Sequence, residues 1–292
     1  MTINKDILVF GKGWIGTRLV DFLNCNSTIK RIATYEDIQS EIDRLKPKVI
    51  INCIGSFGKN VDDCELNKTK TIFSNTFIPL LMGEAALRNK IKLVHISSGC
   101  LFNYDYKENR PLDETTIPDF NDLYYSRCKE YAESGLLALG SAANILIVRP
   151  RMILDYISHP RNLLDKLISF NSVIDLENSV TYMPDFLHAV RHLISKDTFG
   201  VYNTVNYGGL RFKELLEAYR TYKQTHSYSI VNQGELKIVR TNLLLSTDKL
   251  EETGFNIRDI HDVLSECVSR YIAIEKGEHT PQEYNQKDRE SK

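Results

Sequence analysis

The sequence predicts an α/β protein whose main domain is a parallel β-sheet wound with helices on both faces. Three observations support this prediction. An apolar run of strand length, residues 6–10, passes directly into the turn Gly11-Lys12-Gly13-Trp14-Ile15-Gly16. Short apolar segments then alternate with segments of helical periodicity as far as Pro150. Beyond that proline the elements become shorter and more mixed, which indicates a smaller C-terminal α/β domain.

The first strand and its glycine turn are typical of a Rossmann-type, dinucleotide-binding unit. Apolar residues after the turn recur at helical spacing, so we expect strand, tight turn and helix. The glycines let the backbone approach a phosphate, and free N–H groups at the helix start hold it. We therefore expect Gly11, Lys12, Gly13, Trp14, Ile15 and Gly16 to bind a dinucleotide. A plain surface turn is the alternative interpretation.

Further strands of the sheet are expected at residues 29–34, 48–55, 92–98 and 144–150. Helices are expected at residues 38–45, from about residue 65 with a break at Pro79, and at 124–140. Between the last two strands, residues 102–122 are polar and contain two prolines, which predicts a long loop. Long loops in compact domains are usually functional.

The C-terminal part is expected to bind the substrate. Helices are expected at residues 162–170, 184–195, 212–222 and 260–275, and strands at 173–176 and 200–206. We therefore predict a dinucleotide-binding domain at 1–150 and a substrate domain at 151–275. Residues 276–292 are polar and lack periodicity, so we expect a disordered tail there.

Composition excludes several classes of protein. The chain has 292 residues, of which 42% are hydrophobic and 26% charged, as in an ordinary soluble protein. The net charge of −1 offers no general attraction for nucleic acid or an anionic membrane. No apolar run approaches the roughly 20 residues that span a bilayer, and residues 1–5 do not resemble a signal peptide. Six cysteines without a paired spacing favour a reduced setting, so we expect a cytoplasmic protein.

The residues after the predicted second strand favour NADP over NAD. An acid at this strand end selects the bare ribose hydroxyl, whereas a base accepts a 2′-phosphate. Lys30 and Arg31 lie here, and no acidic residue stands between this strand end and Glu36. Lys12 adds a positive charge within the glycine turn. Solvated surface charge explains Lys30 and Arg31 equally well.

Tyr125 and Lys129 place a phenol and an ammonium on one face of a predicted helix. The nearby positive charge favours the phenolate, lowers the pKa of the tyrosine and makes it a usable acid. Tyr219 and Lys223 have the same spacing, but no partner hydroxyl is evident there, so we interpret them as a helix surface. Ser97 and Ser98, in contrast, end a buried strand, where open α/β sheets bind their ligands.

Ser98, Tyr125 and Lys129 thus form a candidate proton-donating set for hydride addition to a ketone. Together with the glycine turn, in this order and at these distances, they resemble an extended short-chain dehydrogenase/reductase. The glycine turn is one residue shorter than is usual in extended reductases, and Ser98 stands where relatives often carry threonine. Both hydroxyls can donate a hydrogen bond.

Within that superfamily the chain resembles the bifunctional nucleotide-rhamnose synthases, which are 3,5-epimerase/4-reductases of nucleotide-linked 4-keto-6-deoxyglucose. The resemblance extends from about Ile7 to Tyr271. Beyond the glycine turn and the Tyr125–Lys129 helix, it rests on Gly99-Cys100-Leu101-Phe102-Asn103-Tyr104-Asp105, Arg149-Pro150-Arg151-Met152, His159-Pro160-Arg161-Asn162 and Gly200-Val201-Tyr202-Asn203.

The resemblance implies epimerisation as well as reduction. The family's proposed acid/base pair maps to Cys100 and Lys166, and Tyr125 would donate the proton at C4. A ketone at C4 acidifies the hydrogens on C3 and C5, so a thiolate and an amine could exchange them through an enolate. Without the resemblance, Cys100 would be interpreted as a small buried hydrophobe and Lys166 as a solvated helix lysine.

The resemblance also implies binding residues. Asn52, Gly55 and Asn75 match positions beside the cofactor, which Tyr125 and Lys129 would also contact; turn formation and helix surface are the alternatives. Arg240, with Arg161 and Asn162 as further candidates, would bind the nucleotide diphosphate, which suits a guanidinium fork. His188 and His192 share a helix face but lack a third ligand, so we predict no metal site.

The leading hypothesis is an NADPH-dependent enzyme that converts UDP-4-keto-6-deoxy-D-glucose, or its dTDP counterpart, to the nucleotide-L-rhamnose. One alternative is reduction alone, as in dTDP-4-dehydrorhamnose reductases. Another is a non-catalytic, NADP-binding protein resembling the regulatory subunit of methionine adenosyltransferase, although the intact Ser98, Tyr125 and Lys129 set argues against it. The sequence leaves open the choice between UDP and dTDP and whether the protein forms a homodimer.

Overall fold

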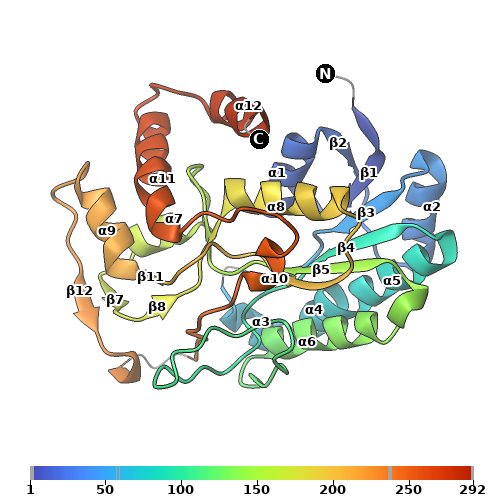
Figure 1. Ribbon diagram of the computed structural model, residues 1–292, viewed down its shortest axis with the longest axis horizontal. Coiled ribbons are helices and arrows are strands. Elements are labelled where there is room, and N and C mark those ends of the chain that lie inside the picture. Colours follow the sequence, from blue (N-terminus) through green and yellow to red (C-terminus); the bar gives the residue numbers. More distant parts are fainter. Residues whose placement is uncertain (1–2, 57, 59, 236–238, 291–292) are drawn as a thin grey trace. The chain divides into compact units, whose positions relative to one another are not determined.

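The computed structural model describes residues 3–56, 58, 60–235 and 239–290, and it consists of two compact units (Figure 1). The first unit contains Met1–Leu101, Pro118–Arg149 and Leu193–Tyr202; the second contains Phe102–Ile117, Pro150–His192 and Asn203–Lys292. The two units interleave in sequence, whereas we predicted consecutive domains. Residues 102–117 belong to the second unit and residues 193–202 to the first.

The first unit is built on a six-stranded sheet with the order β10-β5-β4-β3-β1-β2. Its strands are β1 (Asn4–Phe10), β2 (Cys25–Ser27), β3 (Val49–Asn52), β4 (Lys92–Ile96), β5 (Ile145–Arg149) and β10 (Gly200–Asn203). The pairs from β2 through β5 are parallel, which confirms the predicted fold class. β10 follows β5 in this sheet, although we had assigned its residues to the substrate domain.

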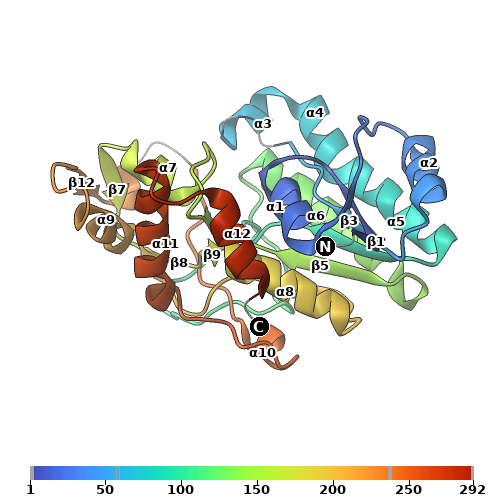
Figure 2. The ribbon, with the colours of Figure 1, turned by 90° about the horizontal axis from the view of Figure 1, so that it is seen from above.

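Helices cover both faces of this sheet, with α5 and α6 on one face and α1 on the other (Figures 1 and 2). The helical elements are α1 (Trp14–Leu23), α2 (Tyr35–Leu45), α3 (Asp62–Leu66), α4 (Lys68–Ile72), the π-helix η1 (Phe73–Phe77), α5 (Ile78–Asn89), α6 (Tyr124–Leu137) and the 3₁₀-helix η2 (Gly140–Ala142). Alternate residues of the strands, such as Leu8 and Ile50, pack against Ile42 of α2 and Met82 of α5. Pro79 is the second residue of α5 and directly follows the π-helical turn η1, which itself continues from α4.

The second strand is shorter and earlier than predicted. We expected residues 29–34, but β2 pairs with β1 at Cys25–Ser27, and the Thr28 amide donates to the carbonyl oxygen of Val9. Thr34 instead caps α2, because its hydroxyl accepts from the Asp37 amide and the Asp37 carboxylate bonds back to Thr34. Lys30 and Arg31 therefore follow the strand end in irregular backbone.

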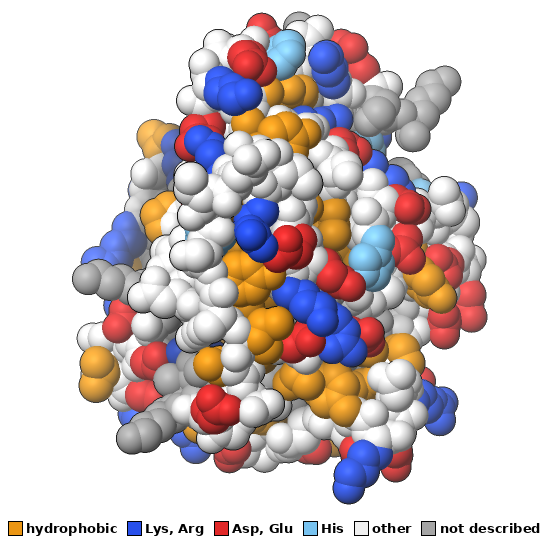
Figure 3. Space-filling model, turned by 90° about the vertical axis from the view of Figure 1, so that its left-hand side faces the viewer, with side chains coloured by type: hydrophobic (Ala, Val, Ile, Leu, Met, Phe, Trp, Pro, Cys, Tyr) orange, Lys and Arg blue, Asp and Glu red, His pale blue; other side chains and the backbone are white. Residues whose placement is uncertain are grey.

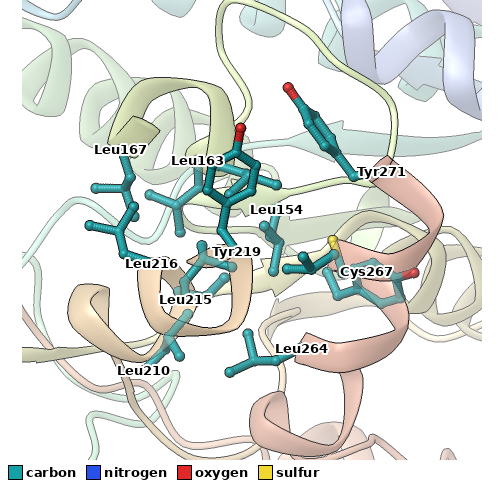
Figure 4. Close-up of a cluster of buried hydrophobic side chains, with 14 of the residues drawn as sticks. Leu154, Leu163, Leu167, Leu210, Leu215, Leu216, Tyr219, Leu264, Cys267 and Tyr271 are labelled. Atoms are coloured by element: carbon teal, nitrogen blue, oxygen red, sulfur yellow. The ribbon is translucent and has the colours of Figure 1, made fainter. Parts of the chain in front are cut away.

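The second unit contains short strands and seven helical elements among its described residues. The strands are β6 (Ile153–Leu154), β7 (Ser172–Ile174), β8 (Glu177–Asn178), β9 (Thr181–Tyr182), β11 (Leu210–Arg211) and β12 (Ser229–Val231). The helices are α7 (Leu163–Ile168), α8 (Met183–Ser195), α9 (Phe212–Arg220), the 3₁₀-helix η3 (Gln233–Glu235), α10 (Asp248–Glu251), α11 (Ile260–Glu275) and α12 (Pro281–Glu290). Leucines from β6, α7, α9 and α11 point toward one another in the core of this unit (Figure 4).

The predicted disordered tail is wrong for the residues that form α12. Tyr284 is buried against Tyr156, with ring centroids 5.4 Å apart. Asp288 accepts a hydrogen bond of 2.6 Å from the Tyr156 hydroxyl and forms a 2.7 Å ion pair with Arg270. These tertiary contacts stabilise a segment whose own composition is strongly polar. Residues 291–292 of the predicted tail lie outside the described residues.

On the face drawn in Figure 3, acidic and basic side chains are interspersed, in agreement with the near-neutral composition. In the described part of the chain, no helix has both the length and the apolar character needed to span a bilayer.

Candidate active site

The glycine turn lies against the loop that follows β3. Gly11 has a φ of +97°, and a Cβ placed on it would lie 2.9 Å from the Cys53 carbonyl carbon and the Ile54 nitrogen. A Cβ on Gly16 would lie only 1.9 Å from the Gly11 carbonyl oxygen. Both positions therefore require glycine so that the turn can close between β1 and β3.

Gly13 differs from its two neighbours because a Cβ there would meet nothing within 4 Å. It is the N-cap of α1 in extended conformation, and its side-chain position faces open space. The first N–H groups of a helix have no partners inside the helix, and they carry partial positive charge. This open, donor-rich turn fits a dinucleotide pyrophosphate. Of the other predicted turn residues, Lys12 is exposed, while Trp14 and Ile15 begin α1.

The strand order favours this edge of the sheet as a candidate ligand site. The chain moves from β1 outward to β2 and then back past β1 to β3, so the helices that follow β1 and β3 lie on opposite faces. In open α/β sheets such a reversal opens a crevice at the carboxyl ends of the two strands. The glycine turn and the Cys53–Gly55 loop lie at these ends.

The Asn52 side chain is hydrogen-bonded to the loop that follows β3. Its Oδ1 accepts from the Ile54 amide at 3.0 Å, and its Nδ2 lies 3.2 Å from His95 Nδ1. Both side chains are fully buried. The pKa of His95 is well below its ordinary value, chiefly because of burial and secondly because of the Lys129 charge.

Asn75 and Gly55 meet at the next residues of this loop. Asn75 is buried in the π-helix η1, accepts from the Ser56 amide at 3.2 Å and donates to the Ser56 carbonyl oxygen at 2.8 Å. A Cβ on Gly55 would lie 3.0 Å from Asn75 Oδ1 and 3.9 Å from Lys129 Nζ. Single π-helical turns are frequent at functional sites. The structure thus brings together Gly55, Asn75 and Lys129, which the sequence had singled out separately.

The two serines that follow β4 have different partners. The Ser97 hydroxyl donates to Glu133, which also forms a buried ion pair with Arg149 at 2.5 Å. Ser98 Oγ accepts from the Cys100 amide at 3.2 Å. Its own hydroxyl proton therefore remains available for a ligand, which supports the choice of Ser98 over Ser97.

Tyr125 and Lys129 lie in the first two turns of α6. Lys129 is 4% exposed, and its Nζ donates to the Ile96 carbonyl oxygen at 3.0 Å. Burial lowers the pKa of Lys129 to about 8, although Glu133 opposes the shift. Tyr125 is partly exposed one turn before it. The carboxyl edge of the sheet thus carries a buried cation beside the predicted cofactor loop.

The second tyrosine–lysine pair is a different kind of structure. Tyr219 is 8% exposed and packs in the core of the second unit, so the helix-surface interpretation is wrong for this residue. Lys223 lies beyond the end of α9 and forms a 2.9 Å ion pair with Glu275.

The remaining predicted residues are divided between the units. Cys100 is partly exposed at the strand end of the first unit, and none of the six cysteines forms a disulfide in the described structure. Lys166 lies on α7 of the second unit, Arg161 is exposed before it, and Arg240 is partly exposed. Asn162 is fully buried as the N-cap of α7, and its side chain bonds Asp155, Ile157 and Asp165. These bonds give Asn162 a structural role in its own loop.

His188 and His192 have ordinary protein partners. His188 Nδ1 lies 2.9 Å from Arg191, and His192 Nε2 lies 3.0 Å from the Thr253 hydroxyl. A search of the described residues finds no cluster of three or more side chains suited to a metal ion.

Two residues near the site, His95 and Glu133, escaped the sequence analysis, and Arg149 entered it only as part of the Arg149-Pro150-Arg151-Met152 motif. Glu133 follows Lys129 by four residues, so the helical spacing could have indicated it. His95 sits within an apolar strand, and only the pairing of β3 with β4 places it beside Asn52.

Comparison with known proteins identifies relatives. The family model for the RmlD substrate-binding domain matches residues 6–180, more than half of the chain. A bifunctional dTDP-4-dehydrorhamnose 3,5-epimerase/dTDP-4-dehydrorhamnose reductase of Arabidopsis thaliana is 29% identical, covering 90% of this chain and 92% of that protein. A trifunctional UDP-glucose 4,6-dehydratase/UDP-4-keto-6-deoxy-D-glucose 3,5-epimerase/UDP-4-keto-L-rhamnose-reductase of the same plant is 29% identical over 84% of this chain but only 39% of its own length.

Solved structures share the fold. A UDP-rhamnose synthase from Acanthamoeba polyphaga mimivirus has a TM-score of 0.83 at 24% identity, covering 90% of this chain and 98% of that one. A dTDP-4-dehydrorhamnose reductase from Bacillus anthracis, solved in complex with NADP, has a TM-score of 0.77 at 20% identity, with coverage of 92% and 98%.

Proposed function

Because the chain belongs to the RmlD substrate-binding domain family, we propose that it is an NADPH-dependent nucleotide-sugar reductase that also epimerises its substrate. The reaction would convert UDP-4-keto-6-deoxy-D-glucose to UDP-L-rhamnose. The observation that carries the proposal is the meeting of Lys129, Gly55 and Asn75 at the carboxyl edge of the sheet. There the Tyr125 helix and the loop expected to bind the cofactor come together.

Several residues suit a bound dinucleotide. The open position of Gly13 and the N–H groups of α1 would hold the pyrophosphate. Asn52 and Asn75 would keep the loop of residues 53–56 in place beside it. NADPH, when bound, supplies the hydride for C4 of the ketosugar.

The protein's part in reduction is proton delivery. Tyr125 would give its phenolic proton to the C4 oxygen as the carbonyl becomes an alcohol, and solvent would later return a proton to the phenolate. The ammonium of Lys129 would stabilise the phenolate formed in this step. Ser98 would donate a hydrogen bond to the same carbonyl oxygen.

Epimerisation is proposed for Cys100 and Lys166. One group would remove a proton from C3 or C5 to give an enolate, and the other would return a proton on the opposite face. The 29% identity to the bifunctional plant enzyme supports this part of the proposal. Arg240 and Arg161 are proposed to bind the nucleotide diphosphate.

The choice of UDP over dTDP rests on two relatives. The trifunctional plant enzyme and the mimiviral synthase are both named for UDP-linked sugars, whereas the bifunctional plant enzyme is named for the dTDP-linked sugar. Oxidation of NADPH would therefore be compared with both ketosugars, and mass spectrometry would identify the product.

The two activities can be separated in one experiment. Tyr125→Phe should lower the reduction rate at least about 100-fold yet leave solvent-deuterium uptake at C3 and C5. Cys100→Ala should suppress that uptake. Tyr131→Phe is the matched control, because Tyr131 is an exposed tyrosine on the same helix. Reduction without any deuterium uptake in the wild type would indicate a reductase alone. If the protein oxidised NADPH with neither ketosugar, the proposed enzymatic function would be refuted.

A further inference from the structure

The short helix α3 contacts both the proposed cofactor loop and the helix that carries Tyr125. On the loop side, Cys64 Sγ lies 3.7 Å from the Ser56 carbonyl oxygen, which Asn75 also binds. Cys64 is buried, and the Thr71 hydroxyl donates to its carbonyl oxygen at 3.4 Å. One side of α3 is therefore attached to the loop of residues 53–56.

The other contact of α3 provides a hydrogen-bond acceptor for a backbone N–H group at the start of α6. Glu65 Oε1 accepts from the backbone N–H of Tyr124, the first residue of α6, at 2.5 Å. The preceding residue, Leu123, has no side chain that can cap the helix. Because the first N–H groups of a helix lack partners within it, a carboxylate from another segment takes the place of the missing cap. Its negative charge also suits the positive end of the helix dipole.

We propose that Glu65 is a positioning residue for Tyr125: it holds the first turn of α6 and thereby ties the Tyr125 hydroxyl to the loop of residues 53–56. Tyr125 directly follows the capped residue, so fraying of the first turn would displace its hydroxyl. Displacements of about 1 Å can cost 100-fold in rate. The catalytic part of this inference rests on the proposed reductase function.

Lys68 offers a competing explanation for any effect of Glu65. Its Nζ lies 4.0 Å from the Glu65 carboxylate and 5.6 Å from the centroid of the Tyr124 ring. Arg127 contacts the same ring at 5.3 Å, so the ring keeps one cation when Lys68 is removed. If Glu65 acted through Lys68, Lys68→Met would have the same effect as loss of Glu65.

Four variants of the full chain test the inference: Glu65→Ala, Glu65→Gln, Lys68→Met and Glu84→Ala. Glutamine keeps an oxygen that can accept from Tyr124. Glu84 is the matched control, because it loses only an exposed ion pair with Arg88 on α5. The measurements are amide hydrogen exchange of the peptide that contains Tyr124 and Tyr125, and kcat and KM for reduction of the ketosugar.

In Glu65→Ala we expect exchange at the start of α6 to rise about 10-fold and kcat to fall about 10- to 100-fold, with KM nearly unchanged. Glu65→Gln should restore both values, and Lys68→Met and Glu84→Ala should match the wild type. Unchanged exchange in Glu65→Ala, or equal effects of the glutamine and alanine variants, would overturn the inference. Normal kcat despite faster exchange would overturn its catalytic part.

The exchange measurement keeps this inference separate from the proposed function. A wild-type protein that oxidises no NADPH would refute the reductase. Faster exchange in Glu65→Ala would still support the cap, because exchange requires no turnover.

Discussion

Asn52 and His95 lie directly opposite each other on the parallel strands β3 and β4, with their side chains joined at the carboxyl edge of the sheet. The Asn52 oxygen accepts from the Ile54 amide, so its NH₂ group faces the ring and His95 Nδ1 must be the acceptor. The proton of the neutral ring therefore resides on Nε2. This arrangement holds His95 neutral beneath the loop that we propose binds the cofactor.

The neutral state of His95 predicts a loss of stability in mild acid. Its pKa is well below the ordinary value in the folded protein because of burial and the Lys129 charge. In the unfolded chain it takes up a proton below about pH 6.5, so the wild type should lose stability as the pH falls through that value. His95→Gln should abolish the contribution of His95 to this loss of stability.

Denaturant unfolding at several pH values provides the measurement. His261→Gln is a control of opposite sign. Partial burial lowers the pKa of His261, but Asp259 and Glu214 outweigh this and raise it. Its removal should therefore make the loss of stability in acid steeper. Parallel stability curves for the wild type and His95→Gln would contradict the prediction.

Two glycines of the turn, Gly13 and Gly16, should respond differently to alanine. Gly16→Ala should destabilise the protein, because its Cβ would collide with the Gly11 carbonyl oxygen. Gly13→Ala adds a methyl group to open space, so its melting temperature should match the wild type. If a pyrophosphate packs on this residue, Gly13→Ala should nevertheless weaken NADPH binding about 10-fold or more. Unchanged NADPH affinity, measured by fluorescence titration, would remove the turn from the proposed site.

The sequence predicted the main sheet well because its strong patterns are local. The apolar runs before Gly11 and Ser97 became β1 and β4, and the Tyr125–Lys129 spacing lies on a helix. The proximity of Gly55 to Lys129 follows from the order of these strands and helices along the chain, because the carboxyl ends of parallel strands lie at one edge of the sheet.

Interactions between distant segments account for what the sequence missed. Residues 29–34 were predicted as a strand, but the backbone pairing with β1 ends near Thr28, and Thr34 caps α2 instead. The helix at residues 281–290 depends on Arg270, a residue of a different helix. Neither the pairing with β1 nor the contact with Arg270 can be read from the sequence of the segment itself.

The position of Arg31 after β2 predicts its effect on cofactor choice. Lys30 already pairs with Asp37 at 3.4 Å and donates to Ser40, whereas Arg31 is exposed. A guanidinium is well suited to a 2′-phosphate. Arg31→Ala should therefore lower the preference for NADPH over NADH about 10-fold, and Lys30→Ala should have a smaller effect. The ratio of kcat/KM for the two cofactors is the measurement, and an unchanged ratio in Arg31→Ala would assign recognition elsewhere.

Lys129 should set the alkaline limit of reduction. Its pKa of about 8 means that it loses its proton as the pH rises through that value. A neutral amine no longer stabilises the phenolate of Tyr125, so kcat should decline above about pH 8. Lys129→Met should lower kcat about 100-fold or more and abolish the decline of kcat above about pH 8. Lys223→Met, which removes a lysine paired with Glu275 in the second unit, is the control and should keep the wild-type profile. A wild-type kcat that stays constant from pH 7 to 9 would contradict the prediction that Lys129 sets the alkaline limit.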